Sequence, residues 1–345
     1  MNVQSEKLKN VATTGKKKLF NREPKPKKPR MTWDEFVVNF KRKAKQPRFW
    51  GSVALNIGMY ILLIGIAFIF LYPFIFMIIT SLKSNADLID PTIGWIPRNL
   101  RWENYSMAFQ MMNFKGYIGN SLLITAVCTI GHLVSCTFVG YGLARFKFRG
   151  RGILFFLVIL TIIVPIQATI TPSYIMFANI KWLDTFLPTF VPSFLGLGLK
   201  GGLFVFLARN FLLSLPKEME EAARIDGCGF LGIFFRIVVP IVRPLLLVIL
   251  VLSIVWHWND YYEPSLYFKQ NMQPLSSGIK ELITLSKLTP EELERRLGRP
   301  VTDDDIINTA TVMAGSFITL TPLIVMFMFL QKQFVQSVER TGLVE

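Results

Sequence analysis

Long stretches without a charged side chain recur along this chain of 345 residues. Four of them contain no Asp, Glu, Lys or Arg: residues 49–82, 116–144, 152–180 and 306–331. Two shorter apolar stretches are residues 185–208, interrupted only by Lys200, and residues 244–259, which follow Arg243. An α-helix needs about 20 apolar residues to cross roughly 30 Å of hydrocarbon, and an arginine at its end can snorkel to the interface. The pattern predicts an all-α polytopic membrane protein with six transmembrane helices.

The charges between these stretches predict the orientation. Basic residues are concentrated in residues 1–50, in the loop after the second stretch and in the loop after the fourth, which are alternate segments. Cytoplasmic loops carry the excess of Lys and Arg, so these segments and both termini are expected to face the cytoplasm. Residues 263–308 hold six basic and eight acidic residues and are expected to form an extracellular loop. Within it, Thr289 followed by Pro290 predicts the start of a short helix.

Composition agrees with a membrane protein, because 52% of the residues are hydrophobic and only 18% are charged. The net charge of +15 does not indicate nucleic-acid binding, since residues 1–50 alone contain fifteen basic and four acidic residues. Residues 1–30 are predicted to be a disordered basic cytoplasmic tail. Residues 31–50 predict an amphipathic interfacial helix that lies on the lipid bilayer, the alternative being a soluble helix that faces a partner. The first apolar run starts too far from the N-terminus for a cleavable signal peptide.

The three cysteines do not predict a disulfide or a metal site. Cys128 and Cys136 are eight residues apart in one apolar stretch, about 12 Å along a helix, which is too far for a disulfide. Cys128, Cys136 and Cys228 are interpreted as small apolar residues.

The most specific segment lies between the fourth and fifth stretches, at residues 214–240. Pro216 suits a first helical turn, and the glutamates after it favour the positive end of a helix dipole. Gly227 and Gly229 can adopt left-handed angles that end a helix, and a second short helix is expected to run to Pro240. The alanine pair Ala222 and Ala223 leaves a shallow surface that another protein can approach.

This segment resembles the EAA loop of ABC importer permeases, which reads Glu-Ala-Ala, then Gly, then a hydrophobic stretch that ends in Pro. The matching residues are Glu221-Ala222-Ala223, Gly227 and Pro240, whereas Cys228 stands where Ala is more usual. The resemblance implies a coupling helix that docks on an ATP-hydrolysing subunit. The residues implied for coupling are Glu220, Glu221, Ala222, Ala223, Asp226 and Gly227.

The similarity extends over residues 51–345. It includes Leu71-Tyr72-Pro73-Phe74, Asn120-Ser121, Gly140 to Phe146, Trp258-Asn259-Asp260-Tyr261 and the tail at Gln333. These segments are similar to the smaller membrane subunit of maltose-type carbohydrate importers. The resemblance implies a six-helix permease domain with the type I ABC importer fold over residues 51–345 and a core at residues 116–333. It also implies a heterodimer with a second permease, two ATPase subunits, and an extracellular solute-binding lipoprotein or periplasmic binding protein.

Several polar residues in the apolar stretches are candidates for the solute pathway. Trp256, Trp258, Asn259 and Asp260 combine aromatic faces with amide and carboxylate groups, which suit a sugar, although tryptophans also gather at membrane interfaces. Lys200, among glycines, indicates either a break in the fourth span or a snorkelling side chain. His132 is expected to form an interhelical hydrogen bond rather than to act in transport.

The sequence therefore predicts a permease subunit in the cell membrane that imports a sugar or oligosaccharide by alternating access. No G-x-x-x-x-G-K-[ST] sequence is present, so the chain is expected to bind no cofactor, and ATP is expected to be used by the partner subunit. A permease for a non-sugar solute is the main alternative. An ion-coupled transporter would need carboxylates in the apolar stretches, and a membrane enzyme would need a catalytic cluster, neither of which the sequence contains.

Overall fold

The computed structural model describes residues 47–300 and 306–342, and every regular element in these ranges is a helix. The predicted tail at residues 1–30 and nearly all of the predicted interfacial helix at residues 31–50 lie outside the described residues. The chain divides into two units, Met1–Leu71 and Tyr72–Glu345.

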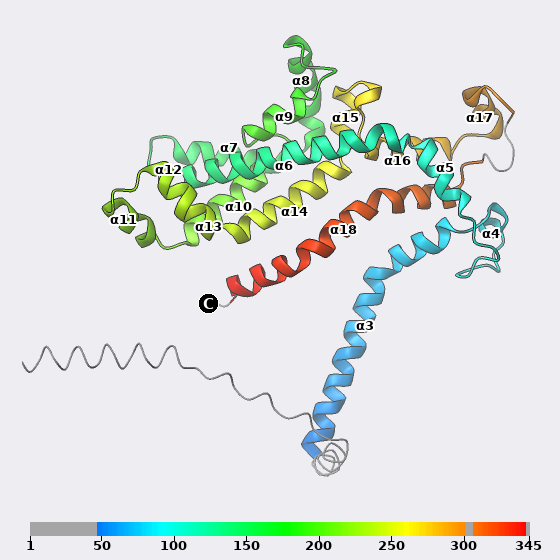
Figure 1. Cartoon of the computed structure of the whole chain (residues 1–345), viewed down its shortest axis with the longest axis horizontal. Helices are drawn as coiled ribbons and strands as arrows, with labels where there is room; N and C mark the ends of the chain where they lie inside the picture. The colour runs from blue at the N-terminus through cyan, green and yellow to red at the C-terminus, as the bar shows by residue number, and fades with distance from the viewer. Residues whose placement is uncertain (1–46, 301–305, 343–345) are drawn as a thin grey trace, which may run out of the picture. The chain divides into compact units, whose positions relative to one another are not determined.

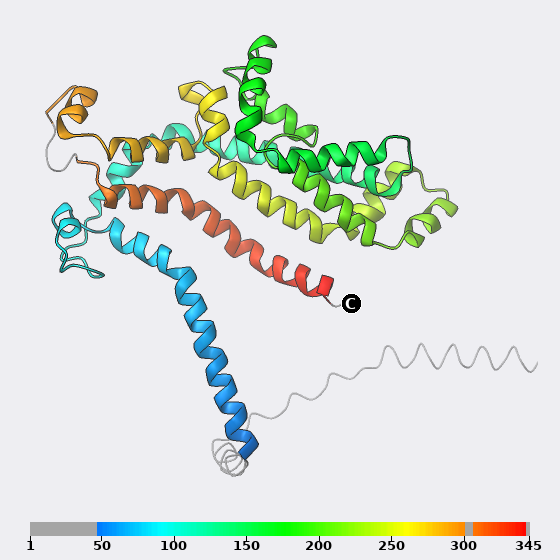
Figure 2. The same ribbon diagram turned by 180° about the vertical axis from the view of Figure 1, so that it is seen from behind.

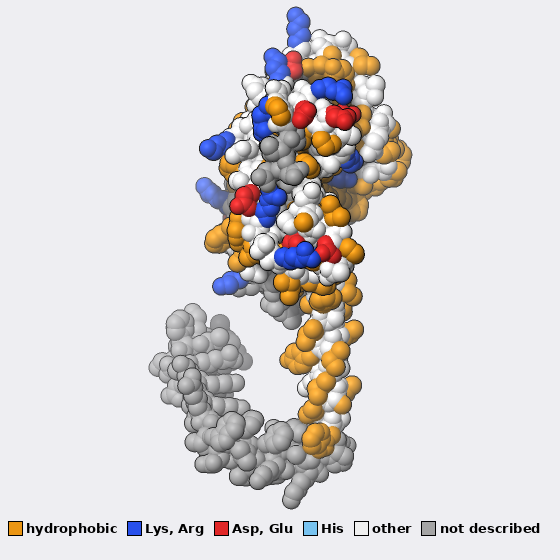
Figure 3. Space-filling view, turned by 90° about the vertical axis from the view of Figure 1, so that its right-hand side faces the viewer, with side chains coloured by type: hydrophobic (Ala, Val, Ile, Leu, Met, Phe, Trp, Pro, Cys, Tyr) orange, Lys and Arg blue, Asp and Glu red, His pale blue; other side chains and the backbone are white. Residues whose placement is uncertain are grey.

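The first long helix, α3 (Pro47–Ser81), is apolar on all sides. Its segment Trp50–Ser81 has a mean hydropathy of 2.8. The visible face of this helix, the lower column in Figure 3, carries hydrophobic and uncharged side chains only. A helix without a polar face suits a lipid or protein surround and not water, which agrees with the predicted first span.

The second unit is organised around one long helix, α6 (Phe114–Arg145). This helix packs against three others, which lie beside it in both ribbon views (Figures 1 and 2): α9 (Leu187–Phe194), α10 (Gly201–Ser214) and α14 (Arg243–Asn259). The core that α6 shares with α10 and α14 contains the fully buried side chains of Tyr141, Phe204 and Ile249. Because α6 contacts all three helices, its position determines how the bundle is arranged.

Two of the predicted spans are not straight helices: the bend in the third corrects the sequence prediction, whereas the break in the fourth is one of the two interpretations given for Lys200. Residues 152–180 form α7 (Arg151–Ile163) and α8 (Ile166–Asn179), whose axes differ by 106°. Pro165 explains the break, because a residue before proline is driven to extended angles, and Val164 has ψ of 121°. Residues 185–208 are split between α9 and α10, and Lys200 lies at the break.

The fifth predicted span, α14, is a helix as expected, but it is preceded by a bent segment. This segment consists of α12 (Phe230–Ile233), the π-helix η1 (Phe234–Val238) and α13 (Val239–Ile241). It meets α14 at an angle of 76°. In the described ranges, three helices are long and apolar enough to cross a membrane, or five if each bent pair forms one span. The predicted number of six is therefore not confirmed.

Most of the remaining helices lie toward the end of α6 opposite the predicted coupling segment, whereas α18 (Thr309–Gly342) starts there and runs back beside α14 (Figure 1). The others are α4 (Asn85–Ile89), α5 (Glu103–Met111), α15 (Tyr262–Tyr267), η2 (Gln270–Met272), α16 (Leu275–Leu285) and α17 (Pro290–Leu297). The predicted helix start at Thr289 is confirmed as a capping box with Glu292. The Asn104 amide donates to the carbonyls of Ser81 and Lys83, which ties α5 to the end of α3.

Candidate functional site

The predicted coupling segment forms a short helix, α11 (Glu218–Ile225), that ends in a glycine turn. Gly227 has φ of 79°, and the Gly227 and Cys228 amides donate to the carbonyls of Arg224 and Ala223. These two bonds form a Schellman motif, which satisfies carbonyls at the helix end and requires left-handed angles at Gly227. The prediction for Gly227 is therefore confirmed. Gly229, in contrast, has φ of −68°, and Pro216 lies before the helix and not in its first turn.

The coupling residues named by the sequence divide between two faces of α11. Glu220 and Ala223 are buried, whereas Glu221, Ala222 and Asp226 are exposed. Two large apolar side chains, Met219 and Ile225, are also exposed, Ile225 to 86%. Exposed apolar side chains beside acidic ones are typical of a protein contact surface. α11 thus has an inner face that packs on its own chain and an outer face available to another protein.

The inner face is held by a buried carboxylate. The Glu220 carboxylate accepts from the Arg145 Nε at 2.7 Å and from the Tyr141 hydroxyl at 2.9 Å. Arg145 Nη2 also donates to the carbonyl of Leu215, at the end of α10, at 3.1 Å. The sequence alone did not indicate Tyr141 and Arg145 as partners of Glu220. Their spacing of four residues, which puts both on one helix face, is the signal that was available.

Aromatic rings connect the same end of α6 to the bent segment. The Tyr141 ring stacks on Phe230 with ring centroids 5.7 Å apart, and it contacts Phe234 at 5.3 Å. Phe138 of α6 lies edge-on to both phenylalanines. The predicted second short helix is therefore present, and it packs on α6 as α11 does.

The fourth predicted span is broken near its middle, as one interpretation of Lys200 expected. Gly196, Gly198 and Lys200 have positive φ angles between the end of α9 and the start of α10. The break leaves carbonyls at the end of α9 without helical partners, and α6 supplies donors both there and at the first residue of α10. Ser135 Oγ donates to the Ser193 carbonyl at 2.8 Å, and Cys136 Sγ donates to that of Gly201 at 3.6 Å.

His132 completes this set of donors. Its Nε2 lies 2.9 Å from the carbonyl of Leu197, and because a carbonyl can only accept, Nε2 carries the hydrogen. Its Nδ1 then accepts from Ser253 at 3.2 Å and faces the Nε2 of His257 at 3.4 Å. The expectation of an interhelical hydrogen bond is confirmed. The sequence did not indicate His257 as a neighbour, because the two histidines are 125 residues apart.

The predicted pathway residues lie on different faces of α14. Trp256 packs against Phe204, and the Lys200 ammonium lies 5.4 Å from its ring centroid. Trp258 is buried, and its indole Nε1 donates to the Thr319 carbonyl of α18. Asn259 is exposed and donates to the Val255 carbonyl of its own helix. The four residues therefore do not form one cluster.

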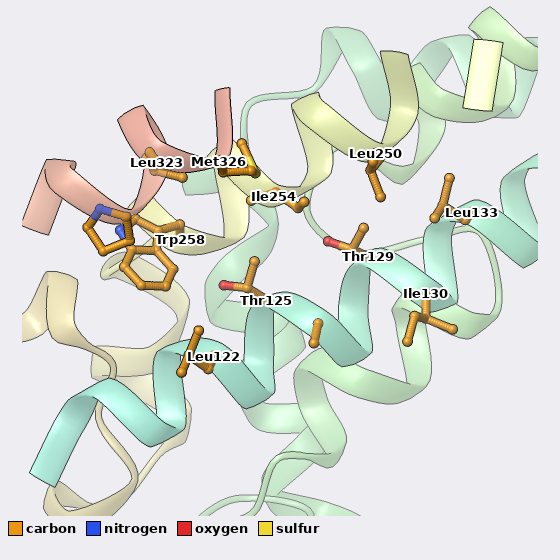
Figure 4. Close-up of a pocket in the computed structure, with 12 residues that line it drawn as sticks. Leu122, Thr125, Thr129, Ile130, Leu133, Leu250, Ile254, Trp258, Leu323 and Met326 are labelled. Atoms are coloured by element: carbon orange, nitrogen blue, oxygen red, sulfur yellow. The ribbon is translucent and has the colours of Figure 1, made fainter. Parts of the chain in front are cut away.

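Trp258 borders a cavity of about 350 Å³ between α6, α14 and α18. In Figure 4 the side chains of Leu250, Ile254, Leu323 and Met326 surround it together with Trp258. The lining is mostly aliphatic, and only the buried hydroxyls of Thr125 and Thr129 add hydrogen-bonding groups, whereas the hydroxyls of a sugar need several partners. The face with Trp256 and Lys200 provides a cation, an aromatic ring and interrupted backbone.

Two carboxyl groups lie close together where α14 ends. Asp260 Oδ1 accepts from the amide of Tyr262 at 2.9 Å, and the Glu263 side chain is buried in α15. Burial, together with the nearby Asp260, raises the pKa of Glu263 to about 8. The described residues contain no group of three or more potential metal ligands among His, Cys, Asp and Glu.

Comparison with known proteins identifies the architecture. The family described as binding-protein-dependent transport system inner membrane component matches residues 136–340, from the middle of α6 through α18. The chain belongs to this family. It is a membrane permease subunit of an ABC importer, a class that works with an ATP-hydrolysing subunit and a solute-binding protein.

Relatives of this permease match it over most of its length. The arabinooligosaccharides transport system permease protein AraQ of Halalkalibacterium halodurans is 28% identical over 80% of this chain and 92% of its own. The sn-glycerol-3-phosphate transport system permease protein UgpE of Yersinia pestis bv. Antiqua is 26% identical over 82% of this chain and 95% of its own. A crystal structure of a bacterial ABC transporter involved in the import of alginate contains a chain with the same fold, with a TM-score of 0.66 and 22% identity. That match covers 82% of this permease and 98% of the other chain.

Proposed function

We propose that this permease imports a sugar or oligosaccharide by alternating access, as one half of a heterodimer with a second permease. The outer face of α11 is the observation that carries the proposal. Glu221, Ala222 and Asp226 are exposed there beside Met219 and Ile225, and the Schellman turn at Gly227 fixes the end of the helix. A short, rigid, amphipathic helix with a free outer face suits docking into a cleft of another protein.

The energy for transport comes from the partner in this proposal. Two ATPase subunits bind and hydrolyse ATP, and closure of these subunits moves α11, which shifts the permease between outward-open and inward-open states. An extracellular solute-binding lipoprotein or periplasmic protein delivers the solute. Loop charge supports a cytoplasmic position for α11 and for both termini, because Arg145, Lys147, Arg149 and Arg151 follow α6 at the same end of the bundle.

The solute class is inferred from the relatives and from the broken helix. AraQ is named for arabinooligosaccharides, and UgpE is named for sn-glycerol 3-phosphate. Non-helical backbone at membrane depth is tolerated where it is buried in protein or lines a water-filled path. We place the solute path beside Lys200 and Trp256, where an aromatic face and an ammonium group can contact a sugar ring and its hydroxyls.

Co-purification with the ATPase subunit tests the first part of the proposal. In the complete transporter, Glu221→Lys reverses a charge on the outer face of α11 and should reduce the amount of bound ATPase by about tenfold, which corresponds to about 1.4 kcal/mol. Glu291→Lys is the matched control, because Glu291 is also an exposed glutamate in the first turn of a short helix. Equal recovery of ATPase in both variants would contradict docking through α11.

Uptake by vesicles that contain the complete transporter tests the solute. The probe is radiolabelled arabinotriose, with sn-glycerol 3-phosphate as the comparison. Lys200→Met and Trp256→Phe should lower ATP-dependent uptake while the ATPase subunit stays bound. If only sn-glycerol 3-phosphate is taken up with ATP, the substrate is an anionic solute and the proposal of a sugar oligomer is wrong. Normal uptake in both variants would mean that the solute path does not run beside Lys200 and Trp256.

A further inference from the structure

A buried ion pair joins α11 to α6 at the cytoplasmic end proposed above. The side chain of Arg145 is 4% exposed and that of Glu220 is 8% exposed. The carboxylate receives one bond from the Arg145 guanidinium and one from the Tyr141 hydroxyl, on one oxygen each. Each oxygen of Glu220 therefore accepts one bond from α6, and burial keeps the carboxylate away from the outer face of α11.

The cost of burying these charges argues for a role beyond packing. Removing two charged groups from water costs several kcal/mol per ion, so a pair of apolar side chains would join two helices as firmly. The ion pair provides geometric specificity instead, because three hydrogen bonds fix the position and the rotation of α11 relative to α6. Arg145 also binds the Leu215 carbonyl, and so it fixes the short connection between α10 and α11.

A different face of α6 contacts the break in the fourth predicted span, because nine residues at about 100° each place His132 on the side of the helix opposite Tyr141. His132, Ser135 and Cys136 bind the carbonyls of Leu197, Ser193 and Gly201. Tyr141 and His132 are nine residues apart on one uninterrupted helix, which corresponds to about 13.5 Å along its axis. A single straight element thus contacts both the coupling helix and the interrupted backbone beside Lys200.

We propose that α6 transmits the movement of α11 to the solute path, with Tyr141, Arg145 and Glu220 as positioning residues. This inference rests on the proposed docking of an ATPase subunit on α11. In this arrangement Glu221 faces the ATPase, Glu220 faces α6, and the two move together. When the ATPase subunits close, α6 shifts with α11 and carries the carbonyls of the break with it.

The test measures how accessible the break is to a thiol reagent, and it does not require the solute to be known. The parent is the complete transporter with Cys228→Ala and Leu197→Cys. Leu197 is 51% exposed at the break, while the native Cys128 and Cys136 are buried and protected from a charged, membrane-impermeant methanethiosulfonate reagent. The rate of modification at residue 197 is measured without nucleotide and after trapping with ATP and vanadate. The parent should show a change of at least about fivefold, as expected for coupled sites.

Two conservative variants remove the link. Tyr141→Phe deletes one hydroxyl, and Glu220→Gln removes the charge but keeps the shape. Both should keep the bound ATPase and its vanadate-trapped nucleotide but lose most of the ATP-dependent change at residue 197, and the double variant should be no worse than the stronger single one. Tyr174→Phe on α8 is the control, because Tyr174 is exposed. Arg145→Lys should restore part of what Arg145→Ala abolishes.

The outcomes separate the two proposals. A parent without any change at residue 197, or variants that keep the full change, would overturn the role of α6. Additive losses in the double variant would also overturn it, because they would mean that Tyr141 and Glu220 act through separate routes. Loss of bound ATPase in Glu221→Lys, with a normal response in Tyr141→Phe, would support docking alone and reject the link. A transporter that binds no ATPase at all would refute the proposed function first.

Discussion

A methyl group added at Gly140 of α6 would lie 2.5 Å from the Ala208 side chain of α10 and 3.0 Å from the Arg209 backbone nitrogen. The two helices therefore meet backbone to backbone at this point. Helices in membranes associate through such close contacts between small residues, since lipid provides no hydrophobic driving force between them. The contact lies one residue from Tyr141, so it also positions the end of α6 that contacts α11.

Gly140→Ala should destabilise the permease, because overpacking forces the helices apart at a cost of about 1–3 kcal/mol. The expected result is a lower melting temperature of the purified transporter in detergent. Gly142→Ala is the matched control on the same helix, since a methyl group there meets nothing within 4 Å. Adding Ala208→Gly should recover part of the loss. An unchanged melting temperature in Gly140→Ala would show that α6 and α10 separate freely at this point.

Gly227 should tolerate substitution only by residues that accept left-handed angles. A methyl group at Gly227 would meet nothing within 4 Å, so the strain in a variant comes from φ of 79° alone. Gly227→Val should cost about 1–2 kcal/mol at the end of α11 and reduce the bound ATPase. Gly227→Asn should be close to the parent, because Asn adopts this conformation more readily. Equal ATPase recovery in the two variants would mean that the turn is not needed for docking.

The sequence predicted features whose signals are local. The turn at Gly227 and the helix start at Thr289 were predicted correctly because a few consecutive residues determine them. The bend after Ile163 was missed because counting charge-free residues ignores Pro165, even though proline is a strong signal for a break. Apolar length therefore showed where membrane segments lie but not whether each one is straight.

The sequence could not predict that Glu220 is buried and Glu221 is exposed, for a different reason. Adjacent residues on a helix point about 100° apart, and nothing in the string Glu-Glu shows which one faces inward. The answer depends on Arg145, which is 75 residues away. In the same way, the sequence correctly predicted that His132 forms an interhelical hydrogen bond, but only the fold shows that the Leu197 carbonyl is also a partner.

Two buried hydroxyls in α6 should respond to removal in opposite ways. Ser135 donates to the carbonyl of Ser193 at 2.8 Å, and the Gly196 amide reaches that carbonyl only at 3.4 Å, so Ser135→Ala removes the shorter bond and should cost about 0.5–1.5 kcal/mol. The Thr129 hydroxyl is buried and has no hydrogen-bond partner among the described residues, so Thr129→Val should be neutral or stabilising. Melting temperatures of the two purified variants provide the comparison. Equal losses in both would contradict the bonding pattern at the break.

The stability of the permease should fall as the pH rises from about 4.5 to about 8, because of Glu263. Its ordinary pKa is 4.5, and burial with the nearby Asp260 raises it to about 8. Between these values the folded chain keeps a proton that the unfolded chain has released. The unfolded state therefore binds fewer protons, and the free energy of unfolding decreases with pH by linkage. The decrease comes to an end above the folded pKa.

Glu263→Gln isolates this contribution, because the amide keeps the shape and cannot ionise. Each pKa unit corresponds to about 1.4 kcal/mol, so the parent should lose stability on the order of a few kcal/mol between pH 5 and pH 8. The variant should have a flatter profile of melting temperature against pH and should exceed the parent at pH 8. Glu291→Gln, at an exposed site in α17, should leave the slope of the parent unchanged. A Glu263→Gln profile as steep as that of the parent would mean that Glu263 is ionised throughout, with water reaching the end of α14.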